Sequence, residues 1–225
     1  MSEQHYLAHM FEPRSIAVLG ASERKDSLGY VLFKNIRASA YAGRLYPINP
    51  RHESIQGVVA YRSLAELDAQ VDLAIIATRA SYVPEIIKQC SQRGIGHVII
   101  VSADFIEAAA ADDERRALEI AHRAGIRVLG PNCLGILRPA LGLNASFSRV
   151  TAEPGHLALV TQSGALCSAV LDWAKSNQVG FSSVISLGRT TEVDFGEVLD
   201  YLSYDHRTQA ILLYIERIRD ARRLL

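Results

Sequence analysis

The sequence predicts an α/β protein that begins with a Rossmann-like, doubly wound parallel sheet. From Ser15 onward, short β-branched apolar runs alternate with longer segments of helical spacing. This alternation is typical of a parallel sheet covered by helices on both faces. Connections between parallel strands are right-handed, so we expect an open, doubly wound sheet.

The first series of elements fills the N-terminal half of the chain. The apolar runs predict strands at 15–19, 44–48, 73–77, 97–101 and 127–129. Helical spacing predicts helices at 29–38, 82–93 and 113–124. The last of these helices has acidic residues in its first turn and Gly125 just past its end, both of which are helix-end signals.

A second series follows an interruption. After Gly130 the periodicity is weak through residues 144–154, and it resumes at Gly155 with expected strands at 157–160, 181–186 and 210–215 and helices at 165–176 and 193–204. We therefore predict a first domain at 1–150 and a second α/β domain at 151–225. Because three strands and two helices are few for such a domain, and residues 220–225 look like the start of another helix, we expect the second domain to be truncated.

Composition excludes several classes of protein. The 225 residues carry 24 basic and 24 acidic side chains, and 49% of them are hydrophobic, as in an ordinary globular protein without a general affinity for nucleic acid. No apolar stretch approaches the roughly 20 residues needed to cross a membrane. No secretory signal precedes Phe11, so we expect a cytoplasmic location. The three cysteines show no metal-ligand or disulfide spacing, so no metal site is expected.

The first candidate site is the turn after strand 15–19. Gly20 permits a tight turn, and the small side chain of Ala21 allows a ligand to approach the turn closely. The hydroxyl of Ser22 or Ser27 could donate to a phosphate oxygen. The following helix would direct free backbone N–H groups at an anion. A bare strand-to-helix turn is the alternative.

The residues after the second expected strand help to identify the ligand of this turn. They read Asn49-Pro50-Arg51 and lack the carboxylate that binds the ribose of NAD, and the turn lacks the full Gly-x-Gly-x-x-Gly pattern. Arg51 suits a ligand with an additional phosphate, because its guanidinium binds phosphate through two parallel hydrogen bonds. NADP and coenzyme A (CoA) both satisfy it, and a solvated loop charge is the alternative for Arg51.

Three runs in the first predicted domain and three in the second resemble a known family. Ser15-Ile-Ala-Val-Leu-Gly-Ala-Ser22, Tyr46-Pro-Ile-Asn-Pro50 and Leu129-Gly-Pro-Asn-Cys-Leu-Gly135 resemble the CoA-binding domain of NDP-forming (ADP-forming) acyl-CoA synthetases, with succinyl-CoA synthetase α subunits as more distant relatives. Thr161-Gln-Ser-Gly-Ala165, Ser186-Leu-Gly188 and Val193-Asp194 resemble the flavodoxin-like domain of the same enzymes.

The resemblance implies CoA or acetyl-CoA as the ligand and assigns roles to residues. Gly20, Ala21 and Ser22 would contact the CoA phosphates, Asn49, Pro50 and Arg51 would flank the adenosine, Thr78 and Ser102 would lie at further strand ends, and Asn132 would lie near the pantetheine. Cys133 is interpreted as a structural thiol, because no histidine is placed beside it.

The second half has its own expected site. The turn Gln162-Ser163-Gly164 precedes a helix and would bind phosphate, and Glu216 matches a glutamate that assists phosphoryl transfer in the family. The family's phosphorylated histidine is expected beyond residue 225, and His156 is interpreted as structural. The complete protein would use ADP or ATP with Mg. Missing C-terminal domains or an ATP-grasp partner would bind this nucleotide, so we do not expect this chain to be catalytically complete alone. A homo-oligomer is a further hypothesis.

Two other functions remain open. Gly142-Leu-Asn-Ala-Ser-Phe147, Val170-Leu-Asp-Trp-Ala174 and Asp220-Ala-Arg-Arg223 also resemble bacterial protein lysine acetyltransferases, in which a synthetase-like region is fused to a GNAT domain and senses acetyl-CoA. The third hypothesis is the NADP-binding Rossmann domain of an oxidoreductase.

Overall fold

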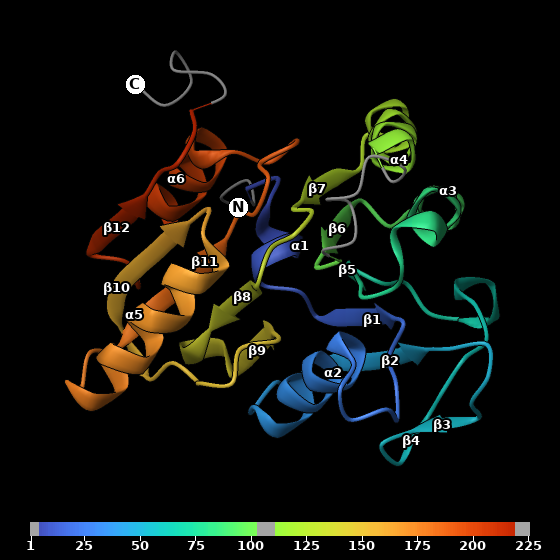
Figure 1. The fold of residues 1–225 in the computed structure, drawn as a ribbon, viewed down its shortest axis with the longest axis horizontal. Coiled ribbons are helices and arrows are strands. Elements are labelled where there is room, and N and C mark those ends of the chain that lie inside the picture. Colours follow the sequence, from blue (N-terminus) through green and yellow to red (C-terminus); the bar gives the residue numbers. More distant parts are fainter. Residues whose placement is uncertain (1–4, 103–110, 219–225) are drawn as a thin grey trace.

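The chain folds into two α/β units placed side by side (Figure 1). The computed structural model describes residues 5–102 and 111–218. The expected helix at 220–225 lies outside the described residues. The predicted fold class, a Rossmann-like parallel sheet followed by a second α/β unit, is confirmed.

The first sheet is parallel throughout. Its strands, in spatial order, are β2 (Arg44–Ile48), β1 (Ser15–Leu19), β5 (Leu73–Ile76), β6 (His97–Ile100) and β7 (Arg127–Leu129). All residues of β1 and β5 are buried, which explains why these strands are continuous apolar runs in the sequence. The sheet is extended from β1 in both directions, because β2 lies on one side of it and β5 on the other.

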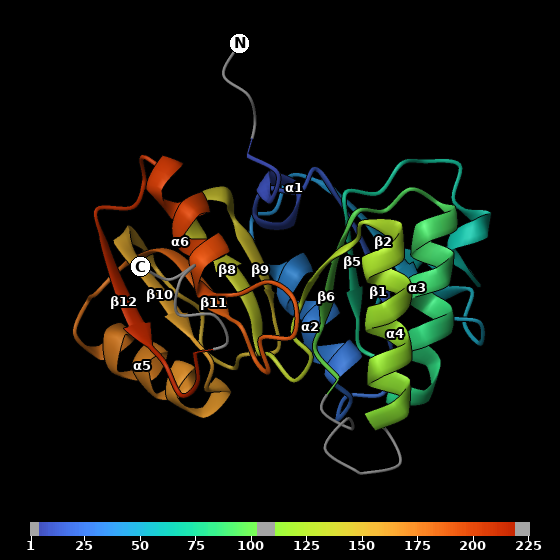
Figure 2. The same ribbon diagram turned by 90° about the horizontal axis from the view of Figure 1, so that it is seen from above.

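Helices cover both faces of this sheet. Figure 2 shows α3 (Val83–Gln92) and α4 (Ala111–Ala124) on the outer face, and α1 (Ala8–Phe11) and α2 (Leu28–Ala38) between the two sheets. Short elements complete the unit: the hairpin β3 (Ser54–Ile55) and β4 (Val58–Val59), and the 3₁₀ turns η1 (Leu64–Glu66) and η2 (Ala80–Tyr82). Helix α1 and the hairpin are too short to give a periodic signal, and the sequence did not predict them.

The second sheet is mixed. Its spatial order is β12 (Ala210–Tyr214), β10 (Pro154–Thr161), β11 (Phe181–Ser186), β8 (Gly135–Arg138) and β9 (Leu143–Ser146), with the 3₁₀ turn η5 (Pro139–Leu141) between the last two. Strands β10, β11 and β12 are parallel, whereas β8 is antiparallel to β11 and β9. Helices α5 (Gly164–Ser176) and α6 (Phe195–Tyr204) pack on opposite faces.

Strands β8 and β9 lie where the sequence showed little periodicity. All eight of their residues are buried, and three of these are polar: Arg138, Asn144 and Ser146. A strand that is buried on both faces and contains polar side chains shows no alternation, so its pattern resembles that of a loop. Residues 135–146 thus contribute to the second sheet, while the division at residue 150 stays a prediction.

One apolar core joins the two units. It contains one face of each sheet, helices α1, α2 and α6, and residues of β8 and β9. A second cluster lies under α3 and α4, and a third lies under α5. The amide of Asn35 in α2 donates to the carbonyls of Ser146 and Ser148, at 2.8 Å each, so α2 is also bonded to the end of the β8–β9 hairpin.

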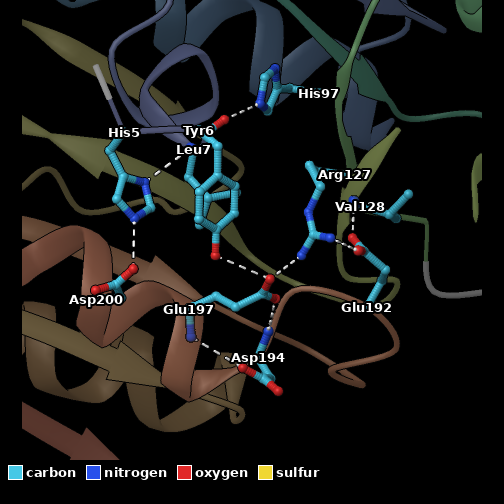
Figure 3. A network of polar contacts seen from close by, with 10 residues as sticks. All are labelled: His5, Tyr6, Leu7, His97, Arg127, Val128, Glu192, Asp194, Glu197 and Asp200. Carbon is cyan, nitrogen blue, oxygen red and sulfur yellow. Dashed lines mark hydrogen bonds and ion pairs between the residues drawn. The ribbon is translucent and has the colours of Figure 1, made fainter. Parts of the chain in front are cut away.

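A polar network fixes the N-terminal segment to both units (Figure 3). Arg127, in the edge strand β7, is ion-paired with Glu192 and with Glu197 of α6. The Tyr6 hydroxyl also donates to Glu197, at 3.2 Å. Burial and the nearby Glu197 carboxylate raise the pKa of Tyr6 to about 12, so this hydroxyl remains a donor. His5 bonds Asp200 at 3.1 Å, and the His97 Nε2–H donates to the Tyr6 carbonyl at 2.8 Å.

None of the helices in the described segments is both long and apolar enough to span a bilayer.

Candidate functional site

The turn after β1 is a close-packed backbone loop. Gly20 has a φ of +87°, and a Cβ at this position would lie 2.7 Å from the Ala77 carbonyl oxygen. Gly29, in the first turn of α2, faces the same loop, and a Cβ there would lie 1.9 Å from the Gly20 carbonyl oxygen. Only glycine fits at these two positions, and their absent side chains let helix α2 approach the turn.

Asn49 ties this turn to the end of β2. Its side-chain amide donates to the Ala21 carbonyl at 2.8 Å, and its side-chain oxygen accepts from the Arg51 N–H at 2.9 Å. The Gly20 N–H donates to the Ile48 carbonyl at 3.1 Å. The two loops are therefore held as one unit before any ligand binds.

A cavity of about 600 Å³ opens beside these loops. It lies at the carboxyl ends of β1, β2 and β5, where Gly20, Asn49 and Thr78 directly follow or lie close to the strand ends. From β1 the chain first adds β2 on one side of β1 and then crosses over to add β5 on the other side. Open α/β sheets bind their ligands at such a switch in strand order. The sequence predicted this position, and six of its expected residues line the cavity: Gly20, Ser22, Asn49, Pro50, Arg51 and Thr78.

The lining of the cavity is strongly cationic although the chain has no net charge. Arg24, Arg62, Arg79 and His52 join Arg51 in the lining, and Glu85 is the acidic residue among the described lining residues. Sequence reasoning missed these additional basic residues. Arg79 could have been found because it follows Thr78 at a strand end, whereas Arg62 reaches the site through the isolated bridge between Ile48 and Tyr61.

Three other predicted residues support the loops from outside the lining. Ala21 is fully buried. The Ser27 hydroxyl caps α2 by accepting from the Tyr30 N–H at 3.2 Å and donates to the Arg24 carbonyl at 2.7 Å. Ser102 is buried, and its hydroxyl donates to the Thr78 carbonyl. Their expected contacts with a ligand stay predictions.

A second cavity, of about 510 Å³, lies at the carboxyl ends of the second sheet. Asn132, Gln162, Ser163, Gly164 and Glu216 all line it, so the structure brings together residues from three distant segments. Ser163 caps helix α5 by accepting from the Leu166 N–H at 3.3 Å. The N-terminus of α5 faces this cavity and favours an anion there.

The remaining candidates occupy structural positions. Cys133 is buried, and burial raises the pKa of its thiol to about 12, so it is not a thiolate at neutral pH. His156 lies in β10, and its Nδ1 bonds the Arg207 carbonyl at 3.1 Å. No cluster of three or more metal-ligating side chains occurs among residues 5–102 and 111–218.

The fold and the first cavity define the class: a doubly wound α/β unit with a cationic, phosphate-compatible cavity at its switch point, followed by a second α/β unit. Residues 14–139 match the family model described as "CoA binding domain", and residues 154–225 match "Succinyl-CoA ligase like flavodoxin domain". The chain belongs to the CoA-binding domain family and carries the succinyl-CoA ligase-like domain after it. The resemblance to NDP-forming acyl-CoA synthetases is thereby confirmed.

Curated relatives with similar sequences are named as CoA ligases. The chain is 40% identical over 221 residues to the α subunit of ADP-forming acetate–CoA ligase II from Pyrococcus furiosus, covering 97% of this chain and 48% of that protein. It is 39% identical over 221 residues to ADP-forming acetate–CoA ligase I from Archaeoglobus fulgidus, covering 97% of this chain and 32% of that protein. The chain therefore spans about a third of the length of one of these relatives and about half of the other.

Solved structures agree with the fold over nearly the whole chain. A crystal structure of a protein from Pyrococcus horikoshii OT3 has a TM-score of 0.92 at 38% identity, covering 97% of this chain and 50% of that one. The dinucleotide-forming acetyl-coenzyme A synthetase 1 of Candidatus Korarchaeum cryptofilum, in complex with phosphate and ADP, has a TM-score of 0.91 at 31% identity, covering 96% and 47%.

Proposed function

We propose that this chain is the CoA-binding part of an ADP-forming acyl-CoA synthetase, with the cationic cavity at the ends of β1, β2 and β5 as the CoA site. The observation that carries this proposal is the cavity itself, in which a close-packed glycine turn and four arginines converge in a chain of zero net charge. Arginine suits phosphate because its planar guanidinium donates two parallel hydrogen bonds.

The composition of the cavity fits the adenosine 3′,5′-bisphosphate end of CoA. Arg51 and Arg79 follow β2 and β5, the strands on either side of β1, and would face the phosphates. Ile48, Ile86 and the half-exposed Tyr82 supply apolar and aromatic surface for a base. The volume of about 600 Å³ lies within the range of ordinary ligand sites.

The second cavity is proposed as the phosphoryl-transfer site of the complete enzyme. The N-terminus of α5, with Ser163 and Gly164, would hold a phosphate group, and Glu216 would face the phosphorylated residue. The adenine nucleotide, with Mg, would bind to further domains or to an ATP-grasp partner, since the chain matches only part of each relative. A cytoplasmic location and a homo-oligomer stay predictions.

The two alternative functions are less well supported. The relatives and solved structures reported above carry ligase or synthetase names, which favours a ligase over a regulatory region of an acetyltransferase. The match of residues 14–139 to a CoA-binding family favours CoA over NADP.

Calorimetric titration of the chain with CoA, acetyl-CoA and NADPH tests the proposal. We expect CoA and acetyl-CoA to bind and NADPH to bind far more weakly; the absence of heat and of a thermal shift with both CoA species would refute the CoA site.

Arg51→Ala refines the test. If Arg51 meets the 3′-phosphate, loss of a charge-assisted hydrogen bond should weaken CoA binding by roughly 10- to 100-fold and dephospho-CoA binding much less. Arg149→Ala is the matched control, because Arg149 is exposed and lies outside the lining of the cavity. Equal losses for the two ligands would remove the role of Arg51 and leave the CoA site itself in place.

A further inference from the structure

The side chain of Gln162 makes an unusual set of contacts at the second cavity. Its oxygen accepts from the backbone N–H groups of Glu216 and Arg217, at 2.8 and 2.9 Å. Its Nε2 donates to the Arg217 carbonyl at 2.9 Å and to the Thr190 hydroxyl at 2.6 Å. The two N–H groups require an acceptor and the carbonyl requires a donor, so the orientation of the amide is unambiguous.

These four bonds use the whole hydrogen-bonding capacity of the amide, which has two donors and two acceptor positions. The backbone N–H of Gln162 is also engaged, with the Tyr214 carbonyl at 3.3 Å. Parallel pairing of β10 with β12 ends at Thr161 and Tyr214. The Gln162 side chain therefore continues this pairing beyond the strands, in the way that a further backbone amide would.

The contact with Thr190 extends the connection to the first unit. Thr190 is buried, has a φ of +53°, and lies in the loop between β11 and α6. In that loop, the Arg189 N–H donates to the Pro131 carbonyl at 3.0 Å, and the Thr191 hydroxyl donates to the Gly130 carbonyl at 2.7 Å. The loop is thus bonded to the segment that leads from β7 of the first sheet into the second cavity.

We infer that Gln162 is a positioning residue: it holds the Glu216–Arg217 turn in place at the cavity and ties this turn, through Thr190, to the loop that contacts Gly130 and Pro131. Direct binding of phosphate by its side chain would require these bonds to break. Ser163 and Gly164, at the helix N-terminus, remain the residues that would meet an anion. The inference rests on the proposed function for the role of Glu216 but not for the geometry of the turn.

Amide hydrogen exchange, measured by NMR on the ¹⁵N-labelled chain, tests the geometry without requiring activity. In Gln162→Met we expect the Glu216 and Arg217 amides to exchange about tenfold faster, because each loses its acceptor, and the core of β10 to be unchanged. Gln209→Met is the matched control, since Gln209 is an exposed glutamine at the opposite end of β12. Wild-type exchange rates at both amides in Gln162→Met would overturn the inference.

Thr190→Val and Thr190→Ser provide a milder pair should Gln162→Met fold poorly. Valine removes the acceptor for Nε2 whereas serine retains a hydroxyl, so we expect faster exchange at Arg217 with valine and rescue with serine. Equal exchange in the two variants would exclude the tie through Thr190.

The functional consequence is tested in the assembled enzyme by ATP formation from acetyl-CoA, phosphate and ADP. We expect Gln162→Met to lower kcat by about tenfold and to leave KM for acetyl-CoA within twofold, because the proposed CoA cavity is separate from the second cavity. Unchanged kcat alongside faster exchange would overturn the positioning role. If the wild-type protein neither binds CoA nor forms ATP, the proposed function fails, and the exchange experiment still decides whether Gln162 holds the turn.

Discussion

Gly29 does not line the proposed CoA cavity, but its replacement by alanine should damage the cavity by displacing the turn at Gly20, which does. The methyl group would be placed 1.9 Å from the Gly20 carbonyl oxygen and 2.8 Å from its carbonyl carbon. Both atoms are backbone, so no side-chain rotation can relieve the overlap. Either the turn around Gly20 or the first turn of α2 must move by more than 1 Å to restore an ordinary contact.

The size of the effect follows from two opposing contributions. Overpacking in a close-packed region costs about 1–3 kcal/mol. Alanine is favoured over glycine in a helix by up to about 1 kcal/mol, which offsets part of that cost. We expect the free energy of unfolding to fall by about 1–2 kcal/mol. Loss of one charge-assisted hydrogen bond from the displaced turn to a phosphate would weaken CoA binding by roughly 10- to 100-fold.

Calorimetric titration with CoA at fixed ionic strength, together with thermal unfolding, measures both effects. Gly96→Ala is the matched control, because Gly96 does not have a positive φ and a Cβ there meets no atom within 4 Å. That variant should bind CoA as the wild type does. Wild-type affinity and stability in Gly29→Ala would refute the argument that the turn is held by close approach of α2.

Three further predictions concern the buried residues Arg138 and Cys133 and the half-buried His97. The Arg138 side chain has 0% exposure and is ion-paired with Asp205 at 2.9 Å. Arg138→Ala leaves the Asp205 carboxylate buried without this partner, so the free energy of unfolding measured by urea titration should fall by about 3–5 kcal/mol. The double variant Arg138→Met with Asp205→Asn removes both charges and should recover part of the loss. Burial lowers the pKa of His97 below 6.5, so the unfolded state takes up the imidazole proton at a higher pH than the folded state does. The free energy of unfolding should therefore fall as the pH drops below about 6.5, and His97→Gln should reduce the slope of this dependence. An unchanged slope would contradict the burial argument. The Cys133 thiol, with its pKa raised to about 12 by burial, should resist iodoacetamide at pH 8 in the folded protein and react in urea; rapid labelling of the folded protein would show that the site opens.

The sequence predicted the parallel elements of the fold well. The strands of the first sheet and helices α2, α3 and α5 match the expected ranges to within one or two residues at each end. These elements have strong periodicity or are continuous apolar runs, because they are buried on defined faces. Strands β8 and β9 were missed because they contain buried polar residues, such as Arg138 and Asn144. Arg138 is bonded to Asp205, which is distant in the sequence, and Asn144 to its neighbour Ser146.

The candidate site was predictable where residues follow strand ends. Gly20 and Asn49 directly follow β1 and β2, and Thr78 lies two residues past the end of β5, so the geometry of a parallel sheet places them at the same edge. Arg24 and Arg62 lie in loops whose path depends on tertiary contacts, and the sequence gives no periodic signal for them. The capacity of Gln162 to bond two backbone positions 54 and 55 residues away also requires the sheet order, which places β12 beside β10.

The order of β8 and β9 in the second sheet has a practical consequence for dividing the chain. They precede β10 in sequence but lie beyond β11 in space, and β9 is also bonded to α2 through Asn35. If the chain were cut near residue 150, the C-terminal piece would lack β8 and β9, and the edge of β11 would be exposed and unpaired. An exposed strand edge can pair with other chains and so promotes aggregation. A cut between Leu129 and Gly135 keeps all five strands of each sheet together, and this is the division at which the two halves should be expressed separately and recombined.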